Sequence, residues 1–536
     1  MATFSSRTPT GDGSASRSGV ASLRDRSRDT IPSRITAQPE PTWNLMQMAG
    51  PTHRDNRFQV TAPRTCRAEL RWIVDVVLGR FLGLDFDLEW TDAPTLTISR
   101  NARSIQTPLT FFERADAAWL DPSTLPIPPR SNWSPASIGL SERLLEADTP
   151  VFFGEPTAER FGSERIRFDF DLLGTIFFLL SRYEEGVLPD RDEHDRFPPT
   201  ASVLGDEDLL VRPIADEYVE VLWNAIHALW PDVPAPPRSR RTRLSCDVDH
   251  LYDPACMSLK GLARRLAGQL IGRSNDGRMS ATVLDHLRVR RHGSFANPYW
   301  TGIERLLEEA GSRGLRATFH FIPRTTDPIR DGDNRPEEPA TGRLIRRIHE
   351  AGHEIGVHPG YNTFRFPEAY ADSVTHFRET LADLGVEQDE LGSRQHYLRW
   401  SSTITPSLCE ASGVDHDSTL GYAQKTGFRA GTARDFPMFD LVGRRGLTCM
   451  QRPLVLMDRT LLSAQYAKSD RIRDLGIARA MAKTSHHYGG NFNILWHNTS
   501  FIPRRGEDLF RAGLWRNPGD SGSSRASRSP SLDPVD

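Results

Sequence analysis

The sequence predicts an α/β protein, with a parallel sheet in the second half of the chain and a smaller α+β region before it. After residue 242, short apolar segments alternate with amphipathic helices, and a parallel strand connection needs such a crossover. Before residue 231, apolar helices and short strands follow one another without that regular alternation. Between the two lies PDVPAPPRSRR, whose prolines and basic residues are typical of an exposed linker.

The composition indicates a folded globular protein. The chain has 536 residues, of which 38% are hydrophobic and 26% are charged, so a wholly disordered chain or a fibrous repeat is excluded. The formal net charge of -3 provides no overall positive charge for a phosphate backbone. We therefore expect no nucleic-acid partner.

The cysteines and the apolar segments bear on the compartment. The 5 cysteines are scattered and form no C-x2-C pair, which favours a reducing environment over a disulfide framework or a cysteine zinc site. The first forty residues lack the apolar stretch of a signal peptide. The longest apolar stretch, Leu172 to Leu180, is far shorter than the roughly 20 residues that span a bilayer. We expect a cytoplasmic protein with no transmembrane segment.

Five segments make up the expected domain organisation. Residues 1–42 and 511–536 are rich in Ser, Arg and Pro without periodicity, and we expect disordered tails there. Residues 43–230 form the expected α+β accessory domain, and 231–241 the linker. Residues 242–510 form the expected second domain, which carries the chemistry.

In the first half, apolar spacing predicts helices over Arg67–Gly83 and Asp169–Glu185. Leu96–Ser99 and Val151–Phe153 resemble short strands. No spacing typical of a catalytic site occurs in this half.

In the second half, helical spacing predicts two surface helices that cover a sheet. One carries Ile303, Leu306, Leu307 and Ala310, and the other carries Tyr370, Val374, Phe377, Leu381 and Leu384. Seven strands are expected between such helices: Arg243–Asp247, Ala317–Ile322, Glu354–Val357, His396–Trp400, Asp417–Tyr422, Leu454–Met457 and Asn493–Trp496. The parallel sheet they form is either open or closed into a barrel.

Acidic, imidazole and guanidinium groups recur where these strands end. Functional residues of parallel sheets gather at that carboxyl edge. A ring of Asp and His there is typical of a catalytic metal site, in which the metal lowers the pKa of a bound water and polarises a carbonyl. Hydrolysis of an amide or ester is the reaction this predicts. The residues are Asp247, Asp249, His250, His320, His358, Asn362, Arg394, His396, Asp415, Asp417, His497 and Asn498.

Residues 240–505 resemble a NodB-type polysaccharide deacetylase, or carbohydrate esterase family four domain, because five motifs follow in the family's order. These are SCDVD, GHEIGVHPGYN, SRQHY, DHDST and LWH. The resemblance implies a distorted (β/α)7 barrel and metal-dependent removal of acyl groups from N-acylated sugars. The resemblance also implies that the divalent metal is zinc. The substrate that it implies is an N-acylated sugar or polysaccharide of bacterial surface glycans.

The resemblance also implies residue roles. In SCDVD, Asp247 takes the position of the general base and Asp249 that of a metal ligand. His358 takes the position of a second ligand, and Arg394 that of the residue that orients the base. His497 takes the position of the general acid, and Asp415 or Asp417 that of the acid of the fourth motif. Tyr397, Asp417 and Trp496, which adjoin these motifs, are the expected substrate-binding residues.

One position departs from the family pattern. The family places a further ligand His four residues after the first, and this chain has Asn362 there. An amide oxygen can bind a metal but replaces imidazole poorly on zinc. Asn362 is therefore the expected third ligand, with His250, His320 and His396 as possible replacements.

The first half resembles the region that precedes such domains in bacterial proteins of polysaccharide biosynthesis, chiefly through GTIFFLLSRYEE and LGRFLGLDFDL. This resemblance implies no site residues.

Two other functions stay open at this point. The departure at Asn362 suits a catalytically inactive relative that binds or scaffolds glycans. A D-x-D motif also occurs in glycosyltransferases that bind a nucleotide sugar, although these need alternating strands and helices ahead of the acids, where this chain has its proline-rich stretch.

Overall fold

The computed structural model describes residues 57–127, 131–205, 207–271, 279–332, 335–463, 471–501, 506 and 509–510. The two predicted tails, 1–42 and 511–536, lie outside these ranges. All described residues belong to one compact unit, residues 54–536. Among them, no helix combines the length and apolar character that crossing a membrane requires.

The first half of the chain builds a six-stranded mixed sheet with the order β2-β1-β3-β4-β8-β7. Alternate residues of its strands are buried, as in β3 and β8, because one face of the sheet packs on helices. The strands are β1 (Phe58–Pro63), β2 (Phe86–Thr91), β3 (Thr95–Arg100), β4 (Arg103–Pro108), β7 (Gly154–Phe161) and β8 (Arg165–Phe170), and β5 (Ser131–Trp133) and β6 (Thr149–Val151) pair separately.

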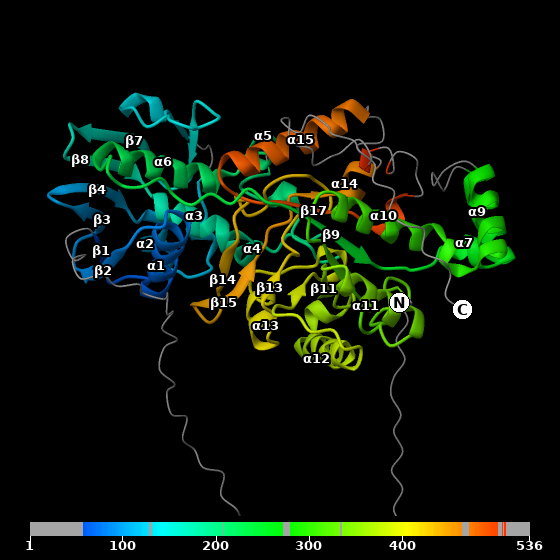
Figure 1. Ribbon diagram of the computed structural model, residues 1–536. Coiled ribbons are helices and arrows are strands. Elements are labelled where there is room, and N and C mark those ends of the chain that lie inside the picture. Colours follow the sequence, from blue (N-terminus) through cyan, green and yellow to red (C-terminus); the bar gives the residue numbers. More distant parts are fainter. Residues whose placement is uncertain are drawn as a thin grey trace, which may run out of the picture. The chain divides into compact units, whose positions relative to one another are not determined.

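The helices of this half gather beside that sheet (Figure 1). In LLGTIFFLL of α3 every residue is buried, and Asp171 begins the helix by accepting the N–H of Gly174 at 2.6 Å. The helices are α1 (Arg67–Val74), η2 (Asp75–Phe81), α2 (Thr110–Ala117), η3 (Pro122–Thr124), η4 (Pro135–Ile138), α3 (Leu172–Leu180), α4 (Tyr183–Val187), η5 (Pro199–Ala201), α5 (Glu207–Leu210) and α6 (Ile214–Leu229). Helices occur at both predicted places and the strand at Leu96–Ser99 is confirmed. The predicted helix Asp169–Glu185 is corrected in part, because Asp169 and Phe170 belong to β8 and Arg182, with φ of 52°, separates α3 from α4.

The second half builds a nine-stranded sheet with the order β14-β15-β13-β12-β11-β10-β9-β17-β16. Every neighbouring pair is parallel except β14 and β15. The strands are β9 (Thr242–Val248), β10 (Thr318–Phe321), β11 (Glu354–Val357), β12 (Gly392–Ser393), β13 (His416–Asp417), β14 (Phe436–Asp440), β15 (Arg445–Gln451), β16 (Leu456–Met457) and β17 (Phe492–Leu495). The predicted parallel sheet with helical crossovers is confirmed.

Helices separate most of these strands along the chain. Helices α11, α12 and α13 group beside β11 and β13 (Figure 1). Ile303, Leu306, Ala310, Val374 and Phe377 are buried in the core between helices and sheet, as their spacing predicts. The helices are α7 (Pro254–Met257), α8 (Leu259–Leu270), α9 (Met279–His292), η6 (Ser294–Ala296), α10 (Pro298–Ser312), α11 (Pro339–Glu350), η7 (Thr363–Arg365), α12 (Pro367–Asp383), η8 (His396–Leu398), α13 (Thr405–Ala411), α14 (Asp458–Leu462), α15 (Arg471–His487) and η9 (Asn498–Phe501).

The implied distorted (β/α)7 barrel is seen only as an α/β sheet with helices, and the strand order shows no closed barrel among the described residues. In the described part of the chain, β14 and β16 stand at the two ends of the hydrogen-bonding order and do not pair with each other. β14 instead pairs antiparallel with β15, and β16 has only two residues for pairing. The sheet is therefore open.

The predicted strand at His396–Trp400 is also corrected. The strand at this place is β12, Gly392–Ser393, and His396–Leu398 form a short 3-10 helix. Tyr397 and Leu398 have φ of 62° and 56°, in the left-handed region that no strand residue adopts. This turn directs His396 back toward the end of the sheet.

Residues from both halves pack into one core. Trp72 of α1 contacts the ring of Phe439 of β14, with centroids 5.3 Å apart. Phe436, Trp400 and Leu420 belong to the same cluster of buried residues as the helices of the first half. Residues 231–241 form no helix or strand, and β9 begins directly after them. The first half is thus in contact with the loops that follow the strands of the second sheet.

Candidate metal centre

Polar groups from four strands of the second sheet meet at its carboxyl edge. Asp247 and Asp249 lie at the end of β9, and His358 directly follows β11. Arg394 and His396 follow β12, and His497 lies two residues beyond β17. Parallel strands end at one edge, so residues far apart in sequence become neighbours.

Asp249, His358 and His396 form a group whose ligand atoms all lie within 4.8 Å of one another. The Nε2 of His358 lies 3.4 Å from Oδ1 of Asp249, and the Nε2 of His396 lies 3.6 Å from the same oxygen. Two imidazoles and one carboxylate are the donors of many catalytic zinc sites. The three side chains thus have the chemistry and the proximity that one divalent cation requires.

Both imidazoles are oriented by hydrogen bonds through their other ring nitrogen. The Nδ1 of His358 bonds to the carbonyl oxygen of Arg394. The Nδ1 of His396 lies 2.8 Å from Oδ1 of Asp331. With Nδ1 engaged in this way, each ring is fixed with its Nε2 facing Asp249, where an unprotonated Nε2 can bind a metal.

Asp331 is itself fixed by the backbone. Its carboxylate accepts the N–H groups of Tyr361 at 2.7 Å, Thr326 at 2.7 Å and Asp327 at 2.9 Å. Burial alone would raise the pKa of Asp331, but the bonds from His396 and these N–H groups hold that pKa below its usual value. The carboxylate is therefore ionised and supports the imidazole of His396.

The surroundings of the Asp249 carboxylate show whether these residues suit a bound cation. Its Oδ1 is buried and has no hydrogen-bond partner in the described structure. Burial would raise the pKa of Asp249, but His358, His396 and His497 hold that pKa below its usual value. An ionised oxygen without a hydrogen bond is costly to bury. A cation between Asp249 and the two imidazoles would compensate for that cost, so the residues fit a metal ion.

Asp247 lies beside this group and is held by a cation. Its Oδ1 lies 3.2 Å from Nη1 of Arg394 and 3.1 Å from Nδ1 of His320. Burial would raise the pKa of Asp247, but Arg394, His358 and His320 hold that pKa well below its usual value. Arg394 also donates to Ser245 Oγ at 2.8 Å, which fixes its guanidinium. Asp247 is thus an oriented, ionised carboxylate next to the group formed by Asp249, His358 and His396.

His497 also lies beside Asp249, and it has a carboxylate partner, Asp458, that the sequence did not predict. Its Nε2 lies 3.9 Å from Oδ2 of Asp249, and its Nδ1 lies 2.7 Å from Oδ1 of Asp458. Burial lowers the pKa of His497, but Asp458 and Asp249 outweigh burial and raise it. Asp458 directly follows the predicted strand Leu454–Met457, so its place at a strand end was a signal that could have identified it.

The structure differs from the predicted ligand set in its third member. The Nδ2 of Asn362 donates to the carbonyl oxygen of Thr326 at 2.9 Å, and its backbone N–H donates to Thr326 Oγ1 at 3.0 Å. Through these bonds Asn362 holds the loop that contains Thr326 and Asp331, so the Nδ2 of its amide is already engaged. His396, one of the three possible replacements, completes the group with Asp249 and His358.

The other two replacements lie elsewhere. His320 faces Asp247, and burial and the nearby Arg394 lower its pKa to about 4 even though Asp247 opposes them. His250 is exposed, and its carbonyl oxygen accepts a bond from Asn498 at 2.8 Å.

The predicted substrate-binding residues have three different surroundings. Tyr397 is half-buried beside the centre, with its ring centroid 4.8 Å from that of His396. Asp417 differs from the prediction, because it is fully buried and its carboxylate accepts bonds from Thr419 and Gln451. Trp496 also differs, because it is fully buried and packs on Phe510. Asp415, the alternative acid, accepts the N–H of Leu391 at 2.7 Å.

A loop of the first half contacts this part of the centre. The ring of His194 lies 4.8 Å from that of Tyr397, and its Nδ1 lies 3.0 Å from the hydroxyl of Tyr361. Arg196 donates to the carbonyl oxygen of Tyr397 at 3.0 Å. Arg399 donates to the carbonyl oxygen of His194 at 2.9 Å. The loop therefore supports the left-handed turn that carries His396.

Comparison with known proteins finds a family model that matches part of the first half and distant likenesses to solved structures over 52% of the chain. Residues 58–231 match DUF7033, a family of unknown function. No curated protein matches the chain.

Solved structures similar to the chain include two provisionally assigned polysaccharide deacetylases and an allantoinase. The deacetylase from Mycobacterium smegmatis is 17% identical, with a TM-score of 0.33, over 52% of this chain and 86% of that one. The one from Pseudomonas aeruginosa PAO1 is 13% identical, with a TM-score of 0.32, over 52% and 87%. Puue allantoinase is 12% identical, with a TM-score of 0.31, over 52% and 86%. These likenesses are too distant to assign an activity to this chain.

Proposed function

We propose that this protein is a metal-dependent hydrolase that removes acyl groups from N-acylated sugars of bacterial surface glycans. The observation that carries the proposal is the group formed by Asp249, His358 and His396, with ligand atoms within 4.8 Å of one another. Asp247 and His497 both lie next to that group, with Oδ2 of Asp247 3.9 Å from Nε2 of His358 and Nε2 of His497 3.9 Å from Oδ2 of Asp249. A base and an acid beside a cation site are what amide hydrolysis requires.

The three ligands would hold a divalent cation, for which zinc suits the nitrogen and oxygen donors. When bound, the ion polarises the substrate carbonyl and makes water more acidic. Asn362 is not needed for this set, because its amide is engaged with Thr326.

The chain's own residues handle the protons. Asp247 is ionised and held by Arg394, so it can accept the proton of the attacking water. As the carbon–nitrogen bond breaks, the leaving nitrogen needs a proton. His497, whose pKa Asp458 and Asp249 raise, can donate it. The pKa of each group is thus shifted in the direction that favours its role, downward for Asp247 and upward for His497.

The sugar as substrate is supported by the five motifs in the sequence and by Tyr397 beside the centre. An aromatic ring at the edge of a site offers an apolar face to a pyranose while its hydroxyl stays hydrated.

The test measures acetate release and metal content together. Zinc-loaded protein should release acetate from N-acetylated oligosaccharides. Asp247→Asn should abolish release while it keeps one equivalent of zinc, because Asp247 is a base and not a ligand. His358→Ala should lose both, and Asp383→Asn, at the exposed end of α12, should change neither. Zinc-loaded protein that releases no acetate would favour the catalytically inactive alternative.

A further inference from the structure

A pocket of about 810 Å³ lies at the other end of the second sheet from the metal centre. Thr242, Thr318 and Glu354 line it, and these are the first residues of β9, β10 and β11. Asp247, Asp249 and His358 lie where the same strands end. The pocket is therefore a separate site, and the proposed hydrolysis makes no use of it.

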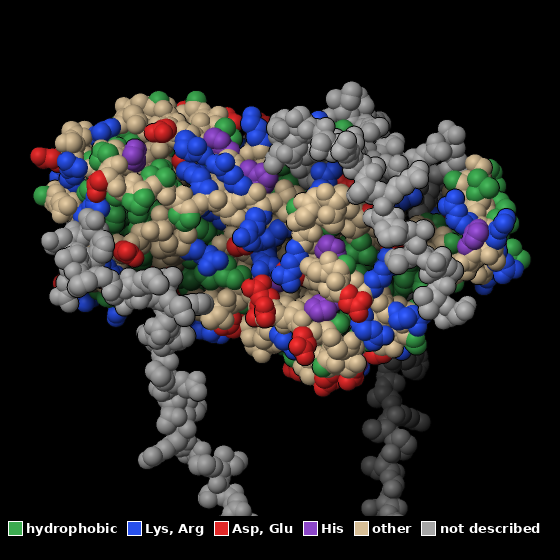
Figure 2. Space-filling view, in the orientation of Figure 1, with side chains coloured by type: hydrophobic (Ala, Val, Ile, Leu, Met, Phe, Trp, Pro, Cys, Tyr) green, Lys and Arg blue, Asp and Glu red, His purple; other side chains and the backbone are tan. Residues whose placement is uncertain are grey.

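The lining of this pocket is dominated by arginine. It contains six arginines and three carboxylates, and Figure 2 shows basic side chains gathered across the middle of this face with acidic ones beside them. The arginines are Arg240, Arg241, Arg243, Arg313, Arg316 and Arg452, and the carboxylates are Glu354, Asp389 and Glu390. The pocket carries an excess of positive charge although the whole chain has a formal net charge of -3.

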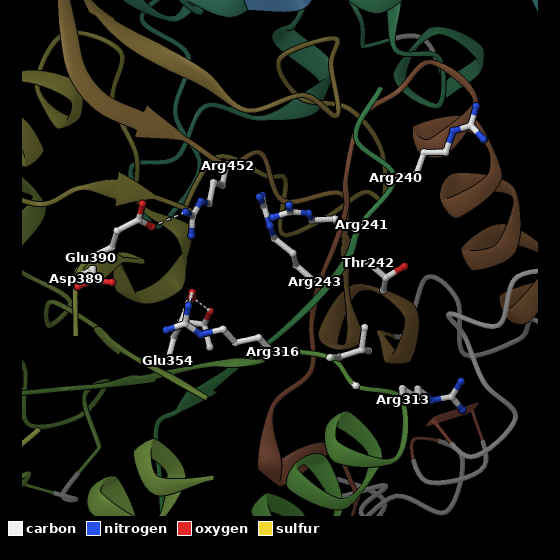
Figure 3. A pocket seen from close by; sticks show the side chains of 13 residues that line it. Arg240, Arg241, Thr242, Arg243, Arg313, Arg316, Glu354, Asp389, Glu390 and Arg452 are labelled. Carbon is white, nitrogen blue, oxygen red and sulfur yellow. Dashed lines mark hydrogen bonds and ion pairs between the residues drawn. The ribbon is translucent and has the colours of Figure 1, made fainter. Parts of the chain in front are cut away.

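Strand geometry directs the arginines into the same space. Arg241 and Arg243 are two residues apart at the start of β9 and so project to the same side. Thr318 is opposite Ser245 in the parallel register of β10 and β9, which brings Arg316 opposite Arg243. Figure 3 shows the guanidinium groups of Arg241 and Arg243 close together, while Arg452 points toward Glu390 and Arg240 and Arg313 point away.

Ion pairs hold part of this group in place. Arg452 lies 2.7 Å from Glu390, and Arg316 lies 3.4 Å from Glu354 (Figure 3). Arg243 pairs with Asp435 through both terminal nitrogens, at 2.8 Å each, and Nη1 of Arg452 also lies 2.7 Å from Nε2 of His416. These contacts orient three guanidinium groups, and each guanidinium keeps further N–H donors for a ligand.

Two arginines have no such partner. Within the described ranges, the side chains of Arg240 and Arg241 make no ion pair or hydrogen bond, and both are exposed. The backbone of Arg241 is fixed, because its N–H donates to Asn491 Oδ1 and its carbonyl oxygen accepts the N–H of Phe492. Arg241 thus offers a full guanidinium charge from a rigid position beside Arg243.

We propose that this pocket binds a small molecule that carries a diphosphate group. Guanidinium groups form paired hydrogen bonds with phosphate oxygens, and several of them arranged around one space match an anion whose oxygens point in several directions. One carboxylate would need only one guanidinium. The volume is within the roughly 300–1,000 Å³ of small-molecule sites, so the phosphates can be attached to an organic group.

The test is isothermal titration of the purified protein with inorganic pyrophosphate and with adenosine diphosphate, each against wild type and Arg241→Gln. We expect both anions to bind wild type, and Arg241→Gln to weaken binding at least fivefold without loss of fold. Arg346→Gln, an exposed arginine of α11 outside the pocket, is the matched control and should bind as wild type does.

Arg241→Gln leaves the residues of the metal centre unchanged, so any anion coordinated there contributes equally to both proteins. The Arg241→Gln/Arg243→Gln protein should show no binding to the pocket and should still release acetate. Equal affinity of wild type and Arg241→Gln would overturn the proposal. Equal affinity for sulfate, phosphate and pyrophosphate would also overturn it, because that result indicates only general attraction of anions.

Discussion

The Nδ1 of His497 lies 2.7 Å from Oδ1 of Asp458, and the same carboxylate accepts the backbone N–H of His497 through Oδ2 at 2.6 Å. Two bonds to one buried carboxylate fix both the position and the tautomer of the imidazole. Asp458 lies at the start of α14 and does not reach the Asp249 group itself, so it acts on the site through His497.

This pair predicts a pH effect. Burial lowers the pKa of His497, and Asp458 and Asp249 raise it above its usual value. An acid must be protonated, so activity should fall as the pH rises through this pKa. Asp458→Asn removes one of the two charges that raise it, and the alkaline limb of kcat/KM should therefore move to lower pH.

The pH–rate profile of acetate release measures this shift. Asp383→Asn is the control, because it removes an exposed carboxylate at the end of α12 that belongs to none of the five motifs. An unchanged alkaline limb in Asp458→Asn would show that His497 is not the acid.

A second prediction concerns metal affinity. Asp331 holds His396 through its Nδ1, and such outer carboxylates contribute about 10- to 100-fold to metal affinity. Asp331→Asn should therefore raise the zinc dissociation constant by that factor, and His396→Ala should raise it further. Competition with a chromophoric chelator measures both.

Substitution of Asn362 should affect zinc binding much less than substitution of His396. If His396 is the third ligand, Asn362→Ala should keep one equivalent of zinc, because only its bonds to Thr326 are lost. Loss of zinc in Asn362→Ala together with retention in His396→Ala would return the ligand role to Asn362.

The sequence predicted those parts of the centre that belong to regular strands. Asp247 and Asp249 follow an apolar strand, and His358 directly follows Val357 of β11, so the carboxyl-edge rule places them together. His396 could be named only as one of three replacements, because the left-handed turn at Tyr397 and Leu398 overrides the apolar pattern of a strand.

Other parts depend on contacts that no local pattern records. Asp331 lies in a loop 65 residues before His396, and only the folded structure shows that the two side chains are hydrogen-bonded. The hairpin of β14 and β15 was missed, and it places the antiparallel strand β14 at one end of the sheet. The basic pocket arises from Arg241, Arg316 and Arg452, which are separated in sequence and meet only through strand register.

A third prediction uses the close approach of β10 and β11. A Cβ on Gly356 would lie 2.3 Å from Cδ2 of His320 and 3.2 Å from the carbonyl oxygen of Gly392. His320 in turn contacts Asp247. Gly356→Ala should therefore displace His320 and reduce acetate release at least tenfold, while circular dichroism at low temperature stays close to that of wild type.

Gly311 is the matched position, because a Cβ there meets no atom within 4 Å and the residue lies in α10. Gly311→Ala should leave activity unchanged and stabilise the protein by about 0.5–1 kcal/mol, since alanine is the better helix former. Full activity in Gly356→Ala would show that the position of His320 does not matter for the reaction.

The last prediction concerns the buried charges that join the two halves of the chain. Glu185 of α4 accepts bonds from Arg429 at 2.6 Å and 3.0 Å and from Arg182 at 2.8 Å, and all three side chains are almost wholly buried. Glu185→Ala would leave two buried guanidinium groups short of a partner. Removing one partner of a buried pair costs about 3–5 kcal/mol, whereas Glu159→Ala, at an exposed pair with Arg167, should cost about 0–1 kcal/mol.

Urea unfolding curves measure both losses, and their pH dependence separates charge from packing. Burial would raise the pKa of Glu185, but Arg429 and Arg182 hold it below its usual value. A carboxylate whose pKa is lowered by folding stabilises the protein above its unfolded pKa, and that stabilisation is lost as the pH falls through the folded pKa. The difference between wild type and Glu185→Ala should therefore shrink under acid conditions. A difference that is independent of pH would mean that Glu185 stabilises the contact by packing and not through its charge.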